Sequence, residues 1–180
     1  QTLCVMVNEE DHLRMQSIKA GLNLSDAYKM IDEVDTKLES TLDYAFDNQY
    51  GYLTACPTNL GTGMRASAML HLPGLVLSEQ INKVINAVNK IGLAVRGLYG
   101  EGTEALGNLF QVSNQHTLGE QENEIIARLE KVIRQIIEHE ENAREKLYNE
   151  KQTILDDKIG RSYAILRYGH IISTKEALDL

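Results

Sequence analysis

The chain has 180 residues, 43% hydrophobic and 24% charged, and this length and composition are typical of one globular domain with its own core. No apolar run approaches the roughly 20 residues that cross a bilayer, so the sequence predicts no membrane span. The net charge of −8 argues against nucleic-acid binding, which depends on Lys and Arg that neutralise phosphates. Two cysteines are too few for a metal cluster, and no signal peptide is evident, so we predict a cytoplasmic protein without a disulfide.

The first half of the chain predicts a strand, a helix and a hairpin. Residues 2–8 are rich in apolar and β-branched side chains, which favours a short strand. Ser25 is a typical N-cap, and apolar residues recur at helical spacing over 26–47. Two further strand-like runs, 51–56 and 65–72, flank a polar bend that contains two glycines, so we expect them to pair as a hairpin with a long tip.

The second half predicts two complete helices and three strands. Ser78 is expected to cap the first helix, whose apolar positions recur through residue 88. Thr117 and Glu120 have the spacing of a capping box, which predicts a helix from there to about residue 150. The sequence ends in "STKEALDL", which reads as the first turns of another helix. The strands are expected at 93–100, 108–114 and 161–172.

Strands that are separated partly by turns and partly by helices predict an α+β fold, in which a mixed, mostly antiparallel sheet is backed by helices. The chain opens directly on a strand-like run and stops inside a predicted helix. We therefore expect it to be a piece of a longer protein.

Charged and reactive side chains collect at the ends of the predicted strands, where a rigid element can direct them into a cleft. Any one of them is most simply explained as an ordinary exposed loop residue, but their convergence favours an anion-binding site. Arginines on separate strand ends offer charged donors to phosphate oxygens, and carboxylates can hold a cationic substrate or a magnesium ion. These residues are Glu9, Glu10, Asp11, His12, Arg14, Cys56, Arg65, Arg96 and Glu101.

Common cofactor motifs are missing from the sequence. "NLGTGMR" lacks the GK[ST] ending of a phosphate-binding loop, no GxGxxG occurs, and the five histidines are scattered. Cys4 lies inside an apolar run and is expected to be a buried small side chain. Cys56 precedes a proline and a polar bend, and the residues alone leave open whether it is a buried side chain or a thiolate favoured by nearby arginines.

Three separated blocks resemble the phosphagen (guanidino) kinase family and occur in the family's order. They are "NEEDHLR" (8–14), "CPTNLGT" (56–62) and "VRGLYGE" (95–101). The resemblance extends over about residues 1–116. Within the family, "YGEGTEALGNLFQVSNQ" and "ENAREKLY" look most like the bacterial protein-arginine kinases, rather than the metabolic arginine or creatine kinases.

The resemblance implies a glutamine-synthetase-like catalytic domain, mostly an antiparallel sheet backed by helices. It implies that residues 1–180 are a single partial catalytic domain, with a motif-bearing sheet core in 1–116 and a long helix and C-terminal extension in 117–180. It further implies transfer of the γ-phosphoryl group of ATP, bound with Mg²⁺, to a guanidinium nitrogen of an arginine side chain in a protein.

The resemblance also implies a role for six residues, and it assigns none to a metal. Two carboxylates would orient the guanidinium and accept its proton, a cysteine would lie beside it, and three arginines would clamp the nucleotide phosphates. In that order they are Glu10 and Glu101, Cys56, and Arg14, Arg65 and Arg96.

Partners follow from the same resemblance. It implies a homo-oligomer at full length, an activator protein, a transcriptional repressor and an AAA+ unfoldase, in the bacterial stress response and protein quality control. Two alternatives stay open: a metabolic kinase that acts on free arginine, and a non-catalytic interaction module whose acidic helix 138–150 binds a partner.

Overall fold

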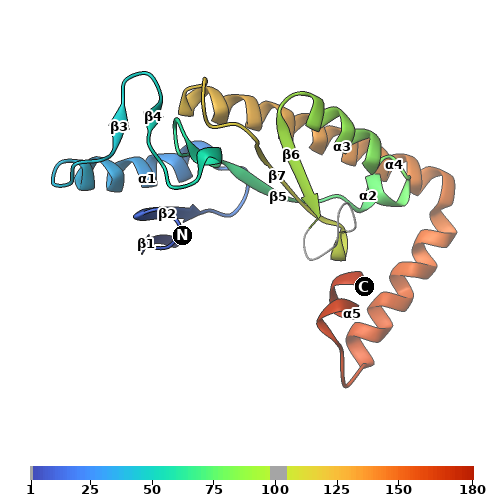
Figure 1. Cartoon of the computed structure of the whole chain (residues 1–180). Coiled ribbons are helices and arrows are strands. Elements are labelled where there is room, and N and C mark those ends of the chain that lie inside the picture. Colours follow the sequence, from blue (N-terminus) through green and yellow to red (C-terminus); the bar gives the residue numbers. More distant parts are fainter. Residues whose placement is uncertain (1, 98–104) are drawn as a thin grey trace. The chain divides into compact units, whose positions relative to one another are not determined.

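The computed structural model describes residues 2–97 and 105–180 (Figure 1). The chain separates into two compact units. The first contains residues 1–68 and 113–131, and the second contains 69–112 and 132–180. Among the described residues, no helix combines the length and the apolar character that a bilayer crossing requires.

The first unit opens with an antiparallel hairpin of β1 (Thr2–Val7) and β2 (Leu13–Ile18). Its loop, residues 8–12, is closed by a hydrogen bond of 3.0 Å from the Asn8 N–H to the His12 carbonyl. The predicted first strand is confirmed. The sequence does not predict β2, because its first residues belong to the charged run "NEEDHLR", which is typical of a loop. Most of β1 is exposed, including Cys4, so the expectation of a buried Cys4 is wrong.

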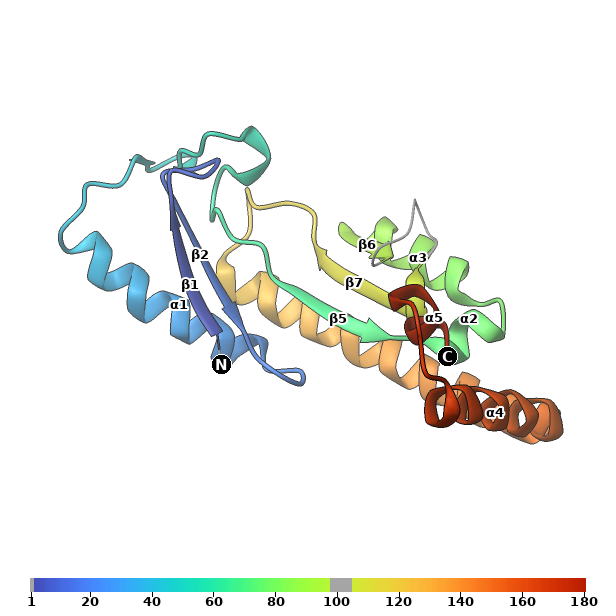
Figure 2. The same ribbon diagram turned by 90° about the horizontal axis from the view of Figure 1, so that it is seen from below.

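Helix α1 (Leu24–Glu39) packs against β2, as Figures 1 and 2 both show. It begins one residue before Ser25, so that Asn23 rather than Ser25 is the N-cap. It also ends well before residue 47, because the hydroxyls of Ser40 and Thr41 donate to the last helical carbonyls. Such side-chain bonds compete with a further helical turn.

Two very short strands follow, β3 (Phe46–Asp47) and β4 (Gly51–Tyr52), and they pair with each other. The Asp47 carboxylate accepts hydrogen bonds from the N–H groups of Gln49 and Tyr50, which stabilises the turn between them. The expected pairing of 51–56 with 65–72 is therefore wrong, since a local turn gives β4 a nearer partner.

A three-stranded sheet is formed in the order β5-β7-β6 by β5 (Ser67–His71), β7 (Leu109–Asn114) and β6 (Leu93–Gly97). Helices α2 (Pro73–Leu77) and α3 (Ile81–Lys90) and the 3-10 turn η2 (Leu106–Asn108) connect these strands in sequence. The predicted strands at 93–100 and 108–114 are thus confirmed within the described residues. Ser78 follows α2, and Gln80 is the N-cap of α3, so the expected capping role of Ser78 is wrong.

Helix α4 (Glu122–Tyr168) is longer than predicted, with one non-helical residue at Lys151. The predicted strand at 161–172 is wrong, because this stretch is mostly helical and is stabilised by pairs four residues apart. Arg161 Nε lies 2.8 Å from an Asp157 carboxylate oxygen, and the Arg167 guanidinium lies 5.6 Å from the Tyr163 ring centre. The final helix is confirmed as α5 (Thr174–Asp179), where Ser173 accepts a hydrogen bond from the Glu176 N–H.

The apolar core of the second unit contains buried residues of α2, α3, α4, β6 and β7, and the first unit buries residues at the start of α4. The second unit also buries a carboxylate, Glu140 of α4, which is 4% exposed. Its oxygens accept hydrogen bonds from the N–H groups of Gly74 (2.8 Å) and Leu75 (2.9 Å) and from Arg144 Nε (2.6 Å). Within 2–97 and 105–180, the buried apolar residues are Leu72, Leu75, Ile85, Val88, Leu93, Phe110, Val112, Val132, Ile133, Ile136 and Ala143 in the second unit, and Ile125, Ile126 and Leu129 in the first.

Candidate active site

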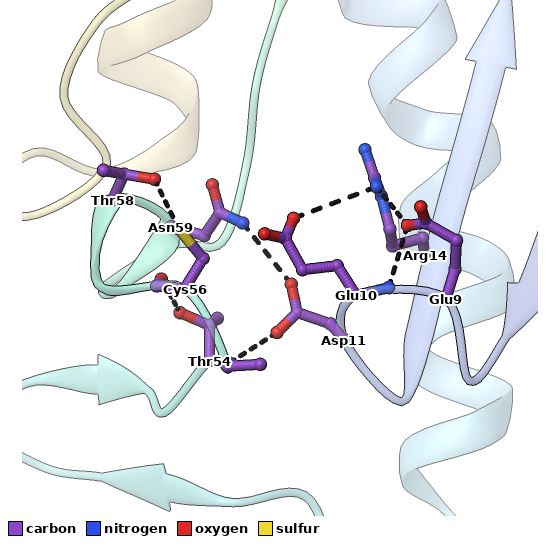
Figure 3. Close-up of polar contacts among 9 residues, drawn as sticks. Glu9, Glu10, Asp11, Arg14, Thr54, Cys56, Thr58 and Asn59 are labelled. Carbon is purple, nitrogen blue, oxygen red and sulfur yellow. Dashed lines mark hydrogen bonds and ion pairs between the residues drawn. The ribbon is translucent and has the colours of Figure 1, made fainter.

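The loop of the β1–β2 hairpin carries an exposed cluster of charges (Figure 3). Glu9 accepts hydrogen bonds from the Glu10 N–H (2.9 Å) and from the Arg14 guanidinium, and both bonds lower the pKa of Glu9. The bond with Glu9 in turn raises the pKa of Arg14. Glu10 lies at 4.0 Å from the same guanidinium nitrogen and is half exposed. Glu9 is therefore the principal partner of Arg14, and the Glu10 carboxylate stays accessible.

Cys56 lies in a second loop, which leaves β4 at Tyr52 and returns to it at Gly61. The backbones of Tyr52 and Gly61 exchange two hydrogen bonds, of 2.8 and 3.3 Å, and close this loop. Cys56 directly precedes the 3-10 turn η1 (Pro57–Asn59), and its carbonyl accepts the Asn59 N–H. Its sulfur lies 2.9 Å from the Thr58 hydroxyl, and the residue is partly exposed. Cys56 is thus not a buried side chain, and its described polar neighbour is a hydroxyl.

Thr117 holds the Cys56 loop in place through hydrogen bonds with the loop backbone. It is buried, and its hydroxyl is within hydrogen-bond distance of the carbonyls of Leu60 (2.7 Å) and Thr58 (3.0 Å). Its carbonyl accepts from the Thr62 N–H at 2.9 Å. The expected capping box is therefore wrong, because the Thr117 side chain serves the loop and α4 begins only at Glu122.

Gly61 has a backbone conformation and surroundings that only glycine tolerates. Its φ is +107°, and a Cβ at this position would lie 2.3 Å from the Thr117 carbonyl oxygen. We expect Gly61→Ala to lower the free energy of unfolding by about 2–3 kcal/mol, because the strain adds to a clash with backbone. Urea denaturation of the variant measures this loss.

Gly63→Ala is the matched control for Gly61→Ala. Gly63 also has positive φ, +61°, but an added Cβ would meet nothing nearer than 3.9 Å. Only the backbone preference is then lost, which costs about 1 kcal/mol. Equal losses in the two variants would contradict the proposed clash.

Arg65 lies between Met64 and Ala66, and the Asn114 side chain forms hydrogen bonds with the backbone of both. Asn114 is 1% exposed, and its side chain accepts from the Ala66 N–H (2.8 Å) and donates to the Met64 carbonyl (3.0 Å). The exposed Arg65 side chain therefore extends from a backbone that is fixed on both sides. Neither Asn114 nor Thr117 could be identified from the sequence as a support for this region.

Asp11 joins the hairpin loop to the Cys56 loop. One carboxylate oxygen accepts from the Ala55 N–H at 2.6 Å, and the other accepts from the Asn59 side-chain amide at 3.4 Å. Figure 3 shows Glu10 and Asp11 on the hairpin loop facing the turn that carries Cys56. The structure thus brings the first two sequence blocks together.

Two predicted residues are not among the described residues of the first unit. Arg96 is an exposed residue of β6 in the second unit, and Glu101 lies outside the described residues. The convergence of all six residues on one site therefore stays a prediction. Within the described ranges, no group of three His, Cys, Asp or Glu side chains is arranged to hold a metal ion.

Known proteins resemble this chain along most of its length. Residues 1–143 match the family described as ATP:guanido phosphotransferase, C-terminal catalytic domain. A relative named Protein-arginine kinase from Pelotomaculum thermopropionicum is 55% identical over 180 residues, which are 100% of this chain and 51% of the relative. A protein of the same name from Clostridium acetobutylicum is 54% identical over 180 residues, which are 100% of this chain and 53% of the relative.

Solved structures of guanidino kinases have the same fold. The duplicated taurocyamine kinase from Schistosoma mansoni, with bound transition state analog components, is 33% identical with a TM-score of 0.69, over 83% of this chain and 20% of that one. Lombricine kinase is 29% identical with a TM-score of 0.69, over 81% of this chain and 40% of that one. These likenesses confirm the predicted α+β guanidino-kinase catalytic fold.

The chain spans about half the length of the curated relatives that it matches. The family match nevertheless covers most of it, and it includes the hairpin loop, the Cys56 loop and Arg65. The family suggested by the three sequence blocks is therefore confirmed: this chain belongs to the ATP:guanido phosphotransferase family.

Proposed function

We propose that the protein to which this chain belongs transfers the γ-phosphoryl group of MgATP to a guanidinium nitrogen of arginine side chains in proteins. The observation that carries this proposal is the identity of 52–55% over essentially the whole chain with relatives named Protein-arginine kinase. Asp11 bonds the hairpin loop to the Cys56 loop, and Figure 3 shows the neighbouring, half-exposed Glu10 facing that loop. This supports the proposal, because an accessible carboxylate is what a guanidinium substrate requires.

Glu10 is proposed to orient the substrate and to accept its proton. An arginine guanidinium is a poor nucleophile while its nitrogen lone pairs are delocalised, and its high pKa keeps it protonated at neutral pH. A carboxylate that binds the planar fork aligns one nitrogen and takes the proton as the N–P bond forms. Glu101 is proposed to hold the fork from a second side, and Cys56 to orient it without forming a covalent intermediate.

Arg14, Arg65 and Arg96 are proposed to bind the phosphates. A guanidinium has five N–H donors, so Arg14 keeps donors for a phosphate oxygen while Glu9 accepts from one of its nitrogens. Positioned arginines stabilise the charge on the transferring group, and the Mg²⁺ that accompanies the nucleotide would neutralise part of it.

The cellular setting is proposed from the family resemblance. It comprises a cytoplasmic homo-oligomer that acts in the bacterial stress response and in protein quality control. Its proposed partners are an activator protein, a transcriptional repressor and an AAA+ unfoldase. Co-purification of each partner with the full-length protein tests these associations one by one.

The test of the activity uses the full-length protein with γ-labelled ATP. We expect acid-labile label on arginine residues of a folded protein substrate, and none on a substrate whose arginines are replaced by lysine. Turnover of free arginine is expected to be much slower. A strong preference for free arginine would instead support a metabolic kinase, and absence of both nucleotide binding and transfer would support a non-catalytic module.

A further inference from the structure

We propose that Asp11 is a positioning residue that couples the loop carrying Glu10 to the loop carrying Cys56, with Asn59 as its partner. Its catalytic consequence rests on the proposed function, whereas the coupling itself does not. Nothing in the candidate mechanism uses Asp11, since no substrate contact has been assigned to it.

The two bonds of Asp11 cross a large distance in sequence. Ala55 and Asn59 lie 44 and 48 residues further along the chain. Asp11 is partly buried, whereas Glu9 and Glu10 on the same loop are exposed, so Asp11 is turned away from the solvent-facing carboxylates. Both of its oxygens have a donor, and a carboxylate with donors on both oxygens is held in one orientation.

Each loop has its own internal closure, but these closures do not link the two loops. The hairpin loop is closed by Asn8 and His12, and the Cys56 loop by Tyr52 and Gly61. Among the described residues, two hydrogen bonds connect the hairpin loop with the Cys56 loop, and the Asp11 carboxylate accepts both. Removing its carboxylate therefore releases the loops from each other while the internal bonds of each remain.

The coupling matters because Glu10 and Cys56 are proposed to contact the same guanidinium. A mutation far from the reacting atoms that misplaces the reacting groups by about 1 Å can lower a rate by about 100-fold. We expect Asp11→Ala to lower kcat for arginine phosphorylation by about 10- to 100-fold, with a smaller change in the KM for ATP. Among the described contacts, Asp11 makes no hydrogen bond or ion pair with the arginines proposed to bind the nucleotide. Its charge acts on Arg14 less than the charges of Glu9 and Glu10 do, so the KM for ATP should change less than kcat.

A charge-preserving exchange separates positioning from simple loss of charge or stability. In Asn59→Asp, two carboxylates face each other, and we expect a loss of kcat similar to that of Asp11→Ala. In the double variant Asp11→Asn, Asn59→Asp, the amide at position 11 still accepts from Ala55 and now donates to position 59. The exchange should restore kcat to within about threefold of the wild type, because its coupling energy offsets the single losses.

A second readout does not depend on phosphoryl transfer. Alkylation of Cys56 by iodoacetamide, followed by peptide mass spectrometry, reports how freely its loop opens. We expect the rate at Cys56 to rise at least about threefold in Asp11→Ala and to return in the exchange variant. Cys4, which is exposed on β1, is the internal reference and should not change.

The outcomes are distinguishable. Unchanged kcat and unchanged Cys56 alkylation in a folded Asp11→Ala protein would overturn the proposal, as would an exchange variant that restores neither. If Asp11→Ala does not fold, the comparison of Asn59→Asp with the exchange variant decides in the same way. If the wild type phosphorylates no arginine, the proposed function fails, while Cys56 alkylation alone still supports or overturns the coupling.

Discussion

Replacement of Glu10 by Gln is expected to lower kcat for arginine phosphorylation by about 1,000-fold, within the range of general base catalysis. Glutamine has the same shape, but it has no negative charge to align the guanidinium and it cannot accept the transferred proton. Glu10 is half exposed, so the fold should be unaffected. Steady-state kinetics with a protein substrate measures kcat, and thermal unfolding shows that the variant is folded.

Glu9→Gln is the matched control, because Glu9 is the same residue type one position earlier in the same loop. Its carboxylate is bonded to Arg14 and to the Glu10 N–H, so its loss should loosen Arg14. We expect a rise in the KM for ATP of a few-fold and a much smaller fall in kcat than in Glu10→Gln. If the two variants lost kcat equally, a specific role of Glu10 as base would be wrong.

The sequence predicts that two of its reactive segments are turns, and the reason is local. "NEEDH" follows a β-branched run, and "CPTN" combines a proline with polar residues, so both read as turns without any knowledge of tertiary contacts. The structure confirms one as a hairpin loop and the other as a 3-10 turn. Glu9, Glu10 and Asp11 therefore lie in a loop and Cys56 directly before a turn, as expected, whereas Arg14 lies in β2.

Pairing between segments could not be predicted in the same way. Strand propensity in 51–56 was recognised, but the choice of β3 as partner depends on the Asp47 turn, which competes with a longer hairpin. The β-branched and aromatic residues of 161–172 favour a strand, although most of this stretch belongs to helix α4. Contacts four residues apart add support to the helix there, against the intrinsic preference for a strand.

The polar contacts that support the site were the least predictable. Asp11, Thr117 and Asn114 each bind backbone groups that lie far away in sequence. No periodicity marks a polar residue whose partner is a distant N–H or carbonyl group. The spacing of Thr117 and Glu120 instead predicts a local capping box, because it matches the pattern of a helix start.

Glu140 presents the same kind of contact in the second unit, and its replacement by Ala is expected to lower the free energy of unfolding by roughly 3–5 kcal/mol. The change leaves the N–H groups of Gly74 and Leu75, at the start of α2, without their acceptor in a buried place. Urea denaturation measures the loss as a lower midpoint at constant slope.

Two variants show whether the buried acceptor is the cause of that loss. Glu140→Gln keeps one acceptor oxygen but turns an amide group toward the second N–H, so we expect an intermediate loss of about 1–2 kcal/mol. Glu141→Ala changes the exposed neighbour on the same helix and should stay within about 0.5 kcal/mol of the wild type. Because Arg144 is half exposed, water can replace its partner, and the ion pair adds little to the difference. A loss in Glu140→Ala no larger than in Glu141→Ala would mean that α2 does not depend on this carboxylate.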